Sequence, residues 1–333
     1  MSDFVKQEGS INAFNGTDAW VILSPIEQSI MQKIEAVGTP LKDWDIQINY
    51  GIKTGCNEAF IISTEKRDEI LANCQSEDER RKTEELIRPI LRGRDIKRYG
   101  YNWAGLYLIA TFPSRHYDIE EYPAVKAYLL SYEDKRLREA GLEIIANEYL
   151  AEFCQQKLAQ VGKRVEIDGQ PVEINKKQEK SRKKTNNKWF ETQDSISYWE
   201  DFYKPKVMWK IIGCNINFSF DESSMICNNA VNIMTGNKDC LLQFMGLMNS
   251  KLFDWYLKQT TEAEVQGGGI QLYVTTLEKT LLKLDFPEEL TDIIYKRFAG
   301  EVQDSEVDNV IYAMYNLSNS EKSYIESCEQ VKR

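Results

Sequence analysis

The chain has 333 residues, of which 42% are hydrophobic and 28% are charged, so it is able to bury a substantial core and is not a disordered tail. It contains no stretch of about eighteen uninterrupted apolar residues, and its N-terminus lacks the basic-then-apolar order of a signal peptide. These features argue against a membrane-spanning or secreted protein. We expect a cytoplasmic chain that forms one large domain or two.

The net charge of −10 is unevenly distributed along the chain. Residues 1–50 carry 3 basic and 7 acidic side chains, and residues 284–333 carry 5 and 11. The segment between them is neutral, with 34 of each sign. Nucleic-acid binders typically have a basic patch, and the overall charge of this chain does not indicate one. A neutral segment is nevertheless able to carry its positive charges on one face.

The first predicted helix starts at Ser24 and Pro25, with Glu27 as the capping-box partner of Ser24, and ends near Gly38. Short alternating or β-branched runs then predict strands over Ile46–Ile52, Ala59–Ser63, Leu106–Phe112, Val207–Gly213, Ile216–Phe220 and Met225–Met234. Composition and spacing favour helices over Glu65–Ala72, Glu77–Ile87 and Pro123–Arg138. Strands interleaved with helices indicate a mixed α/β (α+β) fold.

The pattern degrades over residues 140–188, where Asn175–Lys188 holds seven basic residues and one acid. A solvated loop and a DNA-contacting arm are both consistent with this basic insertion. Farther on, Leu241–Tyr256 is apolar nearly all round, which predicts a buried helix that packs on a mixed sheet. Glycines 267–269 then predict a flexible break, and two helices follow, over Val307–Tyr315 and after a cap at Ser318 with Glu321 three residues on.

Motifs for catalysis are missing from the sequence. There is no glycine-rich turn for S-adenosylmethionine, no N-P-P-Y-type loop, no Walker loop and no zinc-protease pair. The carboxylates at Asp194, Glu200 and Asp201 beside Lys204 lack the spacing of a nuclease site and favour a surface cluster. The single histidine, His116, is expected on the surface. Neither zinc nor disulfides are indicated by the seven scattered cysteines, Cys56, Cys74, Cys154, Cys214, Cys227, Cys240 and Cys328.

Five segments, in order, resemble the target-recognition region of type IIG restriction-modification enzymes and its TaqI-like C-terminal specificity domain. The first, WDIQINYGIKTGCNEAFII, spans Trp44–Ile62. The others are LIRPILRGRDIKRYG (Leu86–Gly100), KWFETQDSISYWEDFYKPKVMWKII (Lys188–Ile212), LLQFMGLMNSKLFDWYLKQ (Leu241–Gln259) and VDNVIYAMYNLSNSEKSYIES (Val307–Ser327). On this resemblance we expect a linker and helix over residues 1–40. A target-recognition domain would span 41–236 with the 140–188 insertion, and the buried helix and a C-terminal helical region would span 237–333.

The resemblance implies a sequence-specific function on double-stranded DNA, with no catalytic centre in this chain. The methyltransferase domain lies N-terminal to this region in the family, so the chain is expected to be a fragment or a separate specificity subunit. It would position DNA for adenine methylation or cleavage by a partner domain or subunit. S-adenosylmethionine and Mg²⁺ are cofactors expected for those catalytic domains and none is expected here. An acidic DNA-mimic or protein-interaction function is the alternative that the charge of −10 suggests.

Candidate DNA contacts fall in three segments. Between Gly51 and Asn57, the glycines permit a close backbone approach and donors come from Lys53, Thr54 and Asn57, although a simple strand-connecting turn explains the glycines equally well. Cations of the second segment are Arg92, Arg94, Lys97 and Arg98, with Asp95 as a possible internal partner. The third set comprises Lys206 and Lys210, expected on one solvent-facing side of a strand, with the weaker candidates Gln271 and Tyr273.

Overall fold

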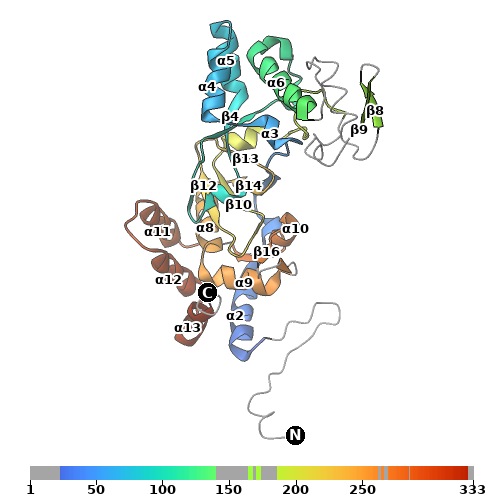
Figure 1. The fold of residues 1–333 in the computed structure, drawn as a ribbon. Coiled ribbons are helices and arrows are strands. Elements are labelled where there is room, and N and C mark those ends of the chain that lie inside the picture. Colours follow the sequence, from blue (N-terminus) through green and yellow to red (C-terminus); the bar gives the residue numbers. More distant parts are fainter. Residues whose placement is uncertain are drawn as a thin grey trace.

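The structure, a computed structural model, describes residues 23–139, 164–167, 170–173, 186–261, 264–265, 269–284 and 286–328. It confirms the predicted mixed α/β class. Figure 1 shows a central sheet with helices α4, α5 and α6 at one end of the molecule and α2, α9 and α11–α13 at the other. Among the described residues, no helix combines the length and apolar character needed to cross a membrane.

The central sheet has four antiparallel strands in the order β12 (Phe218–Asp221), β10 (Lys206–Lys210), β14 (Val231–Gly236) and β2 (Ile46–Tyr50). Val207 lies opposite Met234, and both side chains enter one hydrophobic core. Their neighbours Met208 and Ile233 are also opposite one another but enter a second core. Because side chains alternate along a strand, the sheet separates two cores and is buried on both faces.

The second core is enclosed by another four-stranded sheet, in which a parallel pair joins β13 to β4. The strands of this sheet are, in order, β13 (Ile226–Cys227), β4 (Ile87–Leu91), β7 (Leu106–Ile109) and β3 (Ile61–Ser63). The helices that contribute side chains to the second core are α3 (Asn57–Phe60), α4 (Thr64–Ala72), α5 (Glu77–Leu86) and α6 (Pro123–Glu139). The last three of these correspond to the three helices that the sequence predicted in this region. The strand predicted from Ala59 begins only at Ile61, because the chain first makes the turn of α3.

The first core contains the apolar segment that was predicted as a single helix over Leu241–Tyr256. It packs on the central sheet as expected, but it is two helices, α8 (Lys238–Met248) and α9 (Lys251–Thr260). Asn249 follows the last residue of α8, and its side-chain amide forms two hydrogen bonds with the backbone of Phe218. Its Oδ1 accepts from the Phe218 N–H at 3.0 Å, and its Nδ2 donates to the Phe218 carbonyl at 2.8 Å. Ser250 then caps the new helix by accepting from the Phe253 N–H.

Terminal segments close the first core. Helix α2 (Pro25–Glu35) begins with the predicted Ser24–Glu27 capping box, and α13 (Asn319–Cys328) follows the predicted Ser318–Glu321 cap. Between α8 and α13 the sequence analysis missed α11 (Glu288–Phe298), which precedes α12 (Asp304–Met314). Strands β1 (Gly38–Pro40) and β17 (Leu281–Lys283) pair antiparallel beside α2.

The predicted insertion at 140–188 lies mainly outside the described residues, including nearly all of the basic run from Asn175. Its described part contains the antiparallel strands β8 (Arg164–Ile167) and β9 (Gln170–Glu173). The predicted domain boundaries near residues 40 and 236 stay predictions. Both cores take side chains from the same central sheet, so the sheet belongs to each of them.

A buried ion pair lies at one end of the central sheet. The Lys206 ammonium and the Asp221 carboxylate are 2.5 Å apart, and both side chains are 0% exposed. Lys206 also donates to the Phe202 carbonyl at 2.7 Å. Burial opposes ionisation of Asp221, yet Lys206 and the neighbouring hydroxyl donors hold the pKa of this carboxyl below its ordinary value. The prediction that Lys206 faces solvent and contacts DNA is wrong, because both faces of the sheet are covered.

Replacing Lys206 by methionine should lower the free energy of unfolding by about 3–5 kcal/mol, since it leaves a buried carboxylate without its counter-charge. Denaturant unfolding followed by circular dichroism measures this loss. Lys238→Met is the matched control, because Lys238 pairs with Glu222 on the exposed surface beside Asp221 and should change stability by less than about 1 kcal/mol. Equal losses in the two variants would show that the buried pair is no more important than the exposed one.

A second buried carboxylate, Asp308 on α12, joins the C-terminal helices to α9. Its Oδ1 accepts from the Lys251 N–H at 2.9 Å, while its Oδ2 is buried without a hydrogen-bond partner among the described residues. Burial raises the pKa of Asp308 to about 6. Nearby, Arg98 lies in the turn between β5 (Ile96–Lys97) and β6 (Gly100–Tyr101). It forms an ion pair with Asp304, at the start of α12, at 3.1 Å and donates to the carbonyl of Asn249, at the end of α8. This polar junction joins the β5–β6 hairpin to the ends of two helices.

Stability should fall as the pH rises through the interval between the unfolded and folded pKa values of Asp308, from about 4 to about 6. The folded state favours the protonated carboxyl, so ionisation above this interval costs up to about 3 kcal/mol. Asp308→Asn keeps an acceptor for Lys251 and removes the charge. It should unfold at a higher temperature than wild type at pH 7.5 and at nearly the same temperature at pH 4. A variant that is less stable than wild type at pH 7.5 would contradict this assignment.

Candidate nucleic-acid interface

The turn Asn228–Ala230, between β13 and β14, is the common neighbour of three segments that the sequence analysis singled out. The Asn228 N–H donates to the Leu91 carbonyl at 2.9 Å, next to the arginine-rich segment. The Asn229 N–H donates to the Ile52 carbonyl at 3.0 Å, at the start of the glycine loop. Ala230 accepts from the Ile211 N–H at 3.0 Å, just after Lys210. Backbone hydrogen bonds therefore hold the three segments around one exposed turn.

In the glycine loop, Lys53 and Asn57 are exposed but Thr54 is not. Thr54 is 3% exposed, donates to the Asn57 Oδ1 at 2.8 Å and accepts from the Cys56 N–H at 3.2 Å. Its predicted role as a DNA donor is therefore corrected, because its hydroxyl is occupied within the loop. A Cβ on Gly51 would stand 2.0 Å from the Asn228 carbonyl oxygen, so this glycine is required by the packing of the chain on the turn.

The cations of the arginine-rich segment fall into two groups, those that pair with a carboxylate of the fold and those that are exposed without such a partner. Arg92 makes a double hydrogen bond to Asp95, with its Nε 3.0 Å and its Nη2 2.9 Å from the carboxylate oxygens. Burial raises the pKa of Asp95, but the hydrogen bonds from Arg92 outweigh it and hold that pKa below its ordinary value. Arg98 is tied to Asp304 and Asn249 at the junction described above. Both arginines are therefore paired within the fold, as the sequence suggested for Asp95, and their assignment as DNA contacts stays a prediction.

Arg94 remains available. Its side chain is exposed, and within the described part of the chain its guanidinium has no hydrogen-bond or ion-pair partner. It lies in the 3-10 turn η2 (Gly93–Asp95), immediately before β5 (Ile96–Lys97). Lys97 is exposed and donates from its Nζ to the Arg94 carbonyl at 2.9 Å, which adds a second cation to the same turn.

Lys210, at the end of β10, is half-buried beside this turn. Burial lowers the pKa of Lys210, and although the nearby Cys214 acts in the opposite direction, the charge of Lys97 adds to the lowering. No carboxylate among the described residues pairs with its ammonium. A Cβ on Gly213 would lie 2.6 Å from the Lys210 Cε and Nζ atoms, so this glycine leaves the space that the ammonium occupies. A cation that is partly desolvated without a counter-charge favours the binding of an anion.

The predicted residues Gln271 and Tyr273 lie beside the same site. Strand β16 (Gly269–Gln271) pairs with β11 (Ile212–Gly213), which places Gln271 opposite Ile212, and β15 (Glu264–Val265) completes the small sheet. Tyr273 precedes the short helix α10 (Val274–Leu277) and is 48% exposed, and Ile212 is 50% exposed. Polar and apolar side chains therefore lie beside the end of the strand that carries Lys210.

Sequence reasoning missed Asn229. It lies on the exposed turn at the centre of the three segments, and its side chain has no hydrogen-bond partner among the described residues. The fold does not use its amide, because the local side-chain bond in this turn is made by Asn228, whose Oδ1 accepts from the Ala230 N–H at 3.2 Å. The available signal was the pair Asn228–Asn229 inside the strand predicted over Met225–Met234, because asparagine is depleted in strands and common in turns. An amide offers the donor and acceptor that match an adenine edge.

Within the described residues, the carboxylates and the histidine singled out in the sequence do not form a metal site. No group of three or more His, Cys, Asp or Glu side chains there is placed to hold a metal ion. Asp201 is buried and held by Lys204 at 2.7 Å and by the Asn49 amide at 2.7 Å, while Asp194 accepts from the Lys53 backbone N–H at 3.3 Å. His116 is exposed, as predicted.

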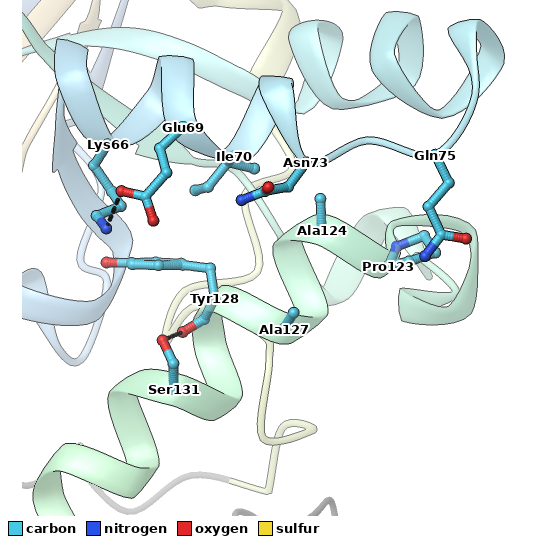
Figure 2. Close-up of a pocket in the computed structure, with 10 residues that line it drawn as sticks. All are labelled: Lys66, Glu69, Ile70, Asn73, Gln75, Pro123, Ala124, Ala127, Tyr128 and Ser131. Atoms are coloured by element: carbon cyan, nitrogen blue, oxygen red, sulfur yellow. Dashed lines mark hydrogen bonds and ion pairs between the residues drawn. The ribbon is translucent and has the colours of Figure 1, made fainter.

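A cavity of about 290 Å³ lies between α4 and α6 (Figure 2). The charged groups that line it are Lys66 and Glu69, which pair with each other at 2.5 Å above the ring of Tyr128. Lys66 is also 5.9 Å from the centre of that ring. Because its charges neutralise each other, this cavity offers no charged group to a ligand.

The family model for TaqI-like C-terminal specificity domains matches residues 88–280, more than half of the chain. The chain belongs to this family. The match contains most of the candidate interface, from Arg94 through Lys210 and Asn229 to Tyr273, and it confirms the resemblance found in the sequence. No curated protein matches the chain.

Two solved structures are similar to this specificity domain. The type IIG restriction endonuclease BpuSI has a TM-score of 0.53 and 12% identity, with 91% of this chain and 31% of that chain covered. The type IIL restriction-modification enzyme MmeI, solved in complex with DNA, has a TM-score of 0.47 and 12% identity, with 86% and 35% covered. The specificity domain thus spans about a third of the length of these enzymes.

Proposed function

We propose that this chain recognises a specific sequence in double-stranded DNA as the specificity part of a restriction-modification methyltransferase. The observation that carries the proposal is the convergence of Arg94, Lys97 and Lys210, three cations without carboxylate partners in the described part of the chain, around the turn at Asn229. Membership of a specificity-domain family is consistent with this role.

The site divides into two kinds of side chain that DNA recognition requires. Arg94, Lys97 and Lys210 supply the positive charge that neutralises phosphates and fixes the position of a duplex. Asn229 and Gln271 carry amides that are able to pair with base edges, and Tyr273 adds an exposed ring. Lys53 and Asn57 extend the site on the side of the glycine loop.

Methylation or cleavage would be performed by domains outside this chain, in the same polypeptide or in a partner subunit. The similar enzymes BpuSI and MmeI are about three times as long as the region that they share with the chain. S-adenosylmethionine and Mg²⁺ would bind to those catalytic domains. The chain itself would position the DNA for adenine modification.

Removing one phosphate-contacting cation should reduce the salt dependence of duplex binding. Each phosphate contact contributes about 0.9 to the slope of log affinity against log salt concentration, because binding releases counterions. We expect Lys210→Gln and Arg94→Ala each to lower this slope by about 0.9. Fluorescence anisotropy with a labelled duplex, titrated at several KCl concentrations, measures the slope.

Lys66→Gln is the matched control, because Lys66 is already paired with Glu69 and lies away from the proposed interface. Its slope should equal that of wild type. An unchanged slope in both Lys210→Gln and Arg94→Ala would remove these cations from the binding surface. If wild type fails to bind duplex DNA at low salt, the proposal is wrong and the acidic, protein-binding alternative is favoured.

A further inference from the structure

A second cavity, of about 230 Å³, lies at the other end of β4 from the proposed DNA interface. It is enclosed by the end of α5, the start of β4 and two 3-10 turns, η3 (Pro113–Arg115) and η6 (Trp199–Tyr203). Cationic and aromatic side chains line it, among them Lys82, Arg88, Arg115, Tyr117, Tyr122 and Tyr203. Unlike the cavity beside Tyr128, this one contains a cation without a counter-charge.

Arg88 is that cation. Its guanidinium lies over the Tyr203 ring, 5.3 Å from the ring centre, and within the described residues no carboxylate pairs with it. Its Nε is buried and has no acceptor there. A buried N–H of a charged group without an acceptor is costly, so an acceptor that enters this cavity would stabilise Arg88.

The other charged groups that line the cavity belong to Lys82, Glu85 and Arg115. The carboxylate of Glu85 is largely exposed and pairs with Arg81 at 3.1 Å. Lys82 is neutralised by Asp78 at 3.0 Å and by Glu121 at 3.3 Å. Arg115 is 3.9 Å from Glu200, and both side chains are largely exposed, so this pair is weak. Two arginines therefore remain to bind an anion, and the guanidinium fork suits phosphate oxygens.

The aromatic residues add a second kind of contact. Tyr203 is 39% exposed, and the rings of Tyr117 and Tyr122 meet edge to face at 5.9 Å. The hydroxyls of Tyr122 and Tyr203 are protonated at neutral pH, because the ordinary pKa of tyrosine is about 10 and burial raises it further. Tyr122 is only 8% exposed, so the ring most open to a ligand is that of Tyr203, and an exposed ring beside an arginine is a surface on which a nucleobase is able to stack.

We propose that this cavity binds one nucleotide, with its phosphate on Arg88 and Arg115 and its base against the tyrosine rings. The volume of about 230 Å³ is below the roughly 300–1,000 Å³ of pockets that enclose whole drug-sized ligands, so the nucleotide would be enclosed only in part and would extend onto the exposed ring of Tyr203. The nucleotide comes either free from solution or from a single-stranded DNA segment. This site is separate from the duplex interface and does not depend on it.

Isothermal titration of the full chain with deoxyadenosine monophosphate, deoxyadenosine, inorganic phosphate and a short oligo(dA) tests the proposal. Wild type should bind the monophosphate at least about tenfold more tightly than the nucleoside or phosphate alone, because both halves of the site contribute. If the monophosphate binds, the site takes free nucleotides; binding of oligo(dA) alone assigns it to single-stranded DNA. No binding of either, or equal binding of inorganic phosphate, overturns the proposal.

Arg88→Gln should weaken the binding at least about tenfold, because it removes the charged donor, and Lys66→Gln should leave it unchanged. Arg115→Gln, at a largely exposed position, provides a second test that does not threaten the fold. Unchanged nucleotide affinity in both arginine variants overturns the assignment. Duplex affinity should be the same in Arg88→Gln and wild type, which separates a failure of this proposal from a failure of the proposed function.

Discussion

The buried ion pair between Lys206 and Asp221 connects the central sheet to the chain that crosses into the second sheet. Asp221 also accepts from the Tyr101 hydroxyl at 2.9 Å and from the Met225 N–H at 3.0 Å. These bonds fix the segment that leads from β12 to β13, and β13 then pairs in parallel with β4. The path of the chain between the two cores therefore depends on one buried carboxylate and its donors.

That constraint also positions the proposed interface. The turn Asn228–Ala230 follows β13 directly and leads into β14, so it is anchored to both sheets. The loops that carry Lys53, Arg94 and Lys210 are hydrogen-bonded to it or to its immediate neighbours. A rigid support of this kind holds the side chains of a recognition site with little loss of conformational entropy on binding.

Local sequence signals predicted much of the fold. The caps at Ser24 and Ser318 were found because capping needs only residues three positions apart. Alternating and β-branched runs located the strands of the central sheet, but the single strand predicted over Met225–Met234 is two strands, β13 and β14, in different sheets. The break at Asn249 was not found, because it depends on a hydrogen bond to Phe218, a distant residue in the sequence. The same limit applied to Lys206, because alternation does not reveal that both faces of a sheet are covered.

The candidate site was predicted only in part, because the sequence shows which segments carry suitable side chains but not which distant residues they contact in the fold. The segments that contain Lys53, Arg94, Lys210 and Gln271 were identified from their residue types, and the structure brings these segments together. Asp95 was recognised as a possible internal partner, because it lies within the arginine-rich segment, and it pairs with Arg92. The pairing of Arg98 was not visible, because its partners Asp304 and Asn249 lie more than a hundred residues away. Asn229 was missed because it fell inside the strand predicted over Met225–Met234, where the structure has a turn between β13 and β14.

Selection of duplexes from a random-sequence pool tests sequence-specific recognition most directly. Wild type should enrich a defined sequence over successive rounds. Asn229→Ala should enrich the same sequence with one base position relaxed, because a good amide–base pair is worth about 1–3 kcal/mol of discrimination at that position. A pool that stays random with wild type, or an identical sequence in both proteins together with unaltered affinity, would contradict recognition through this turn.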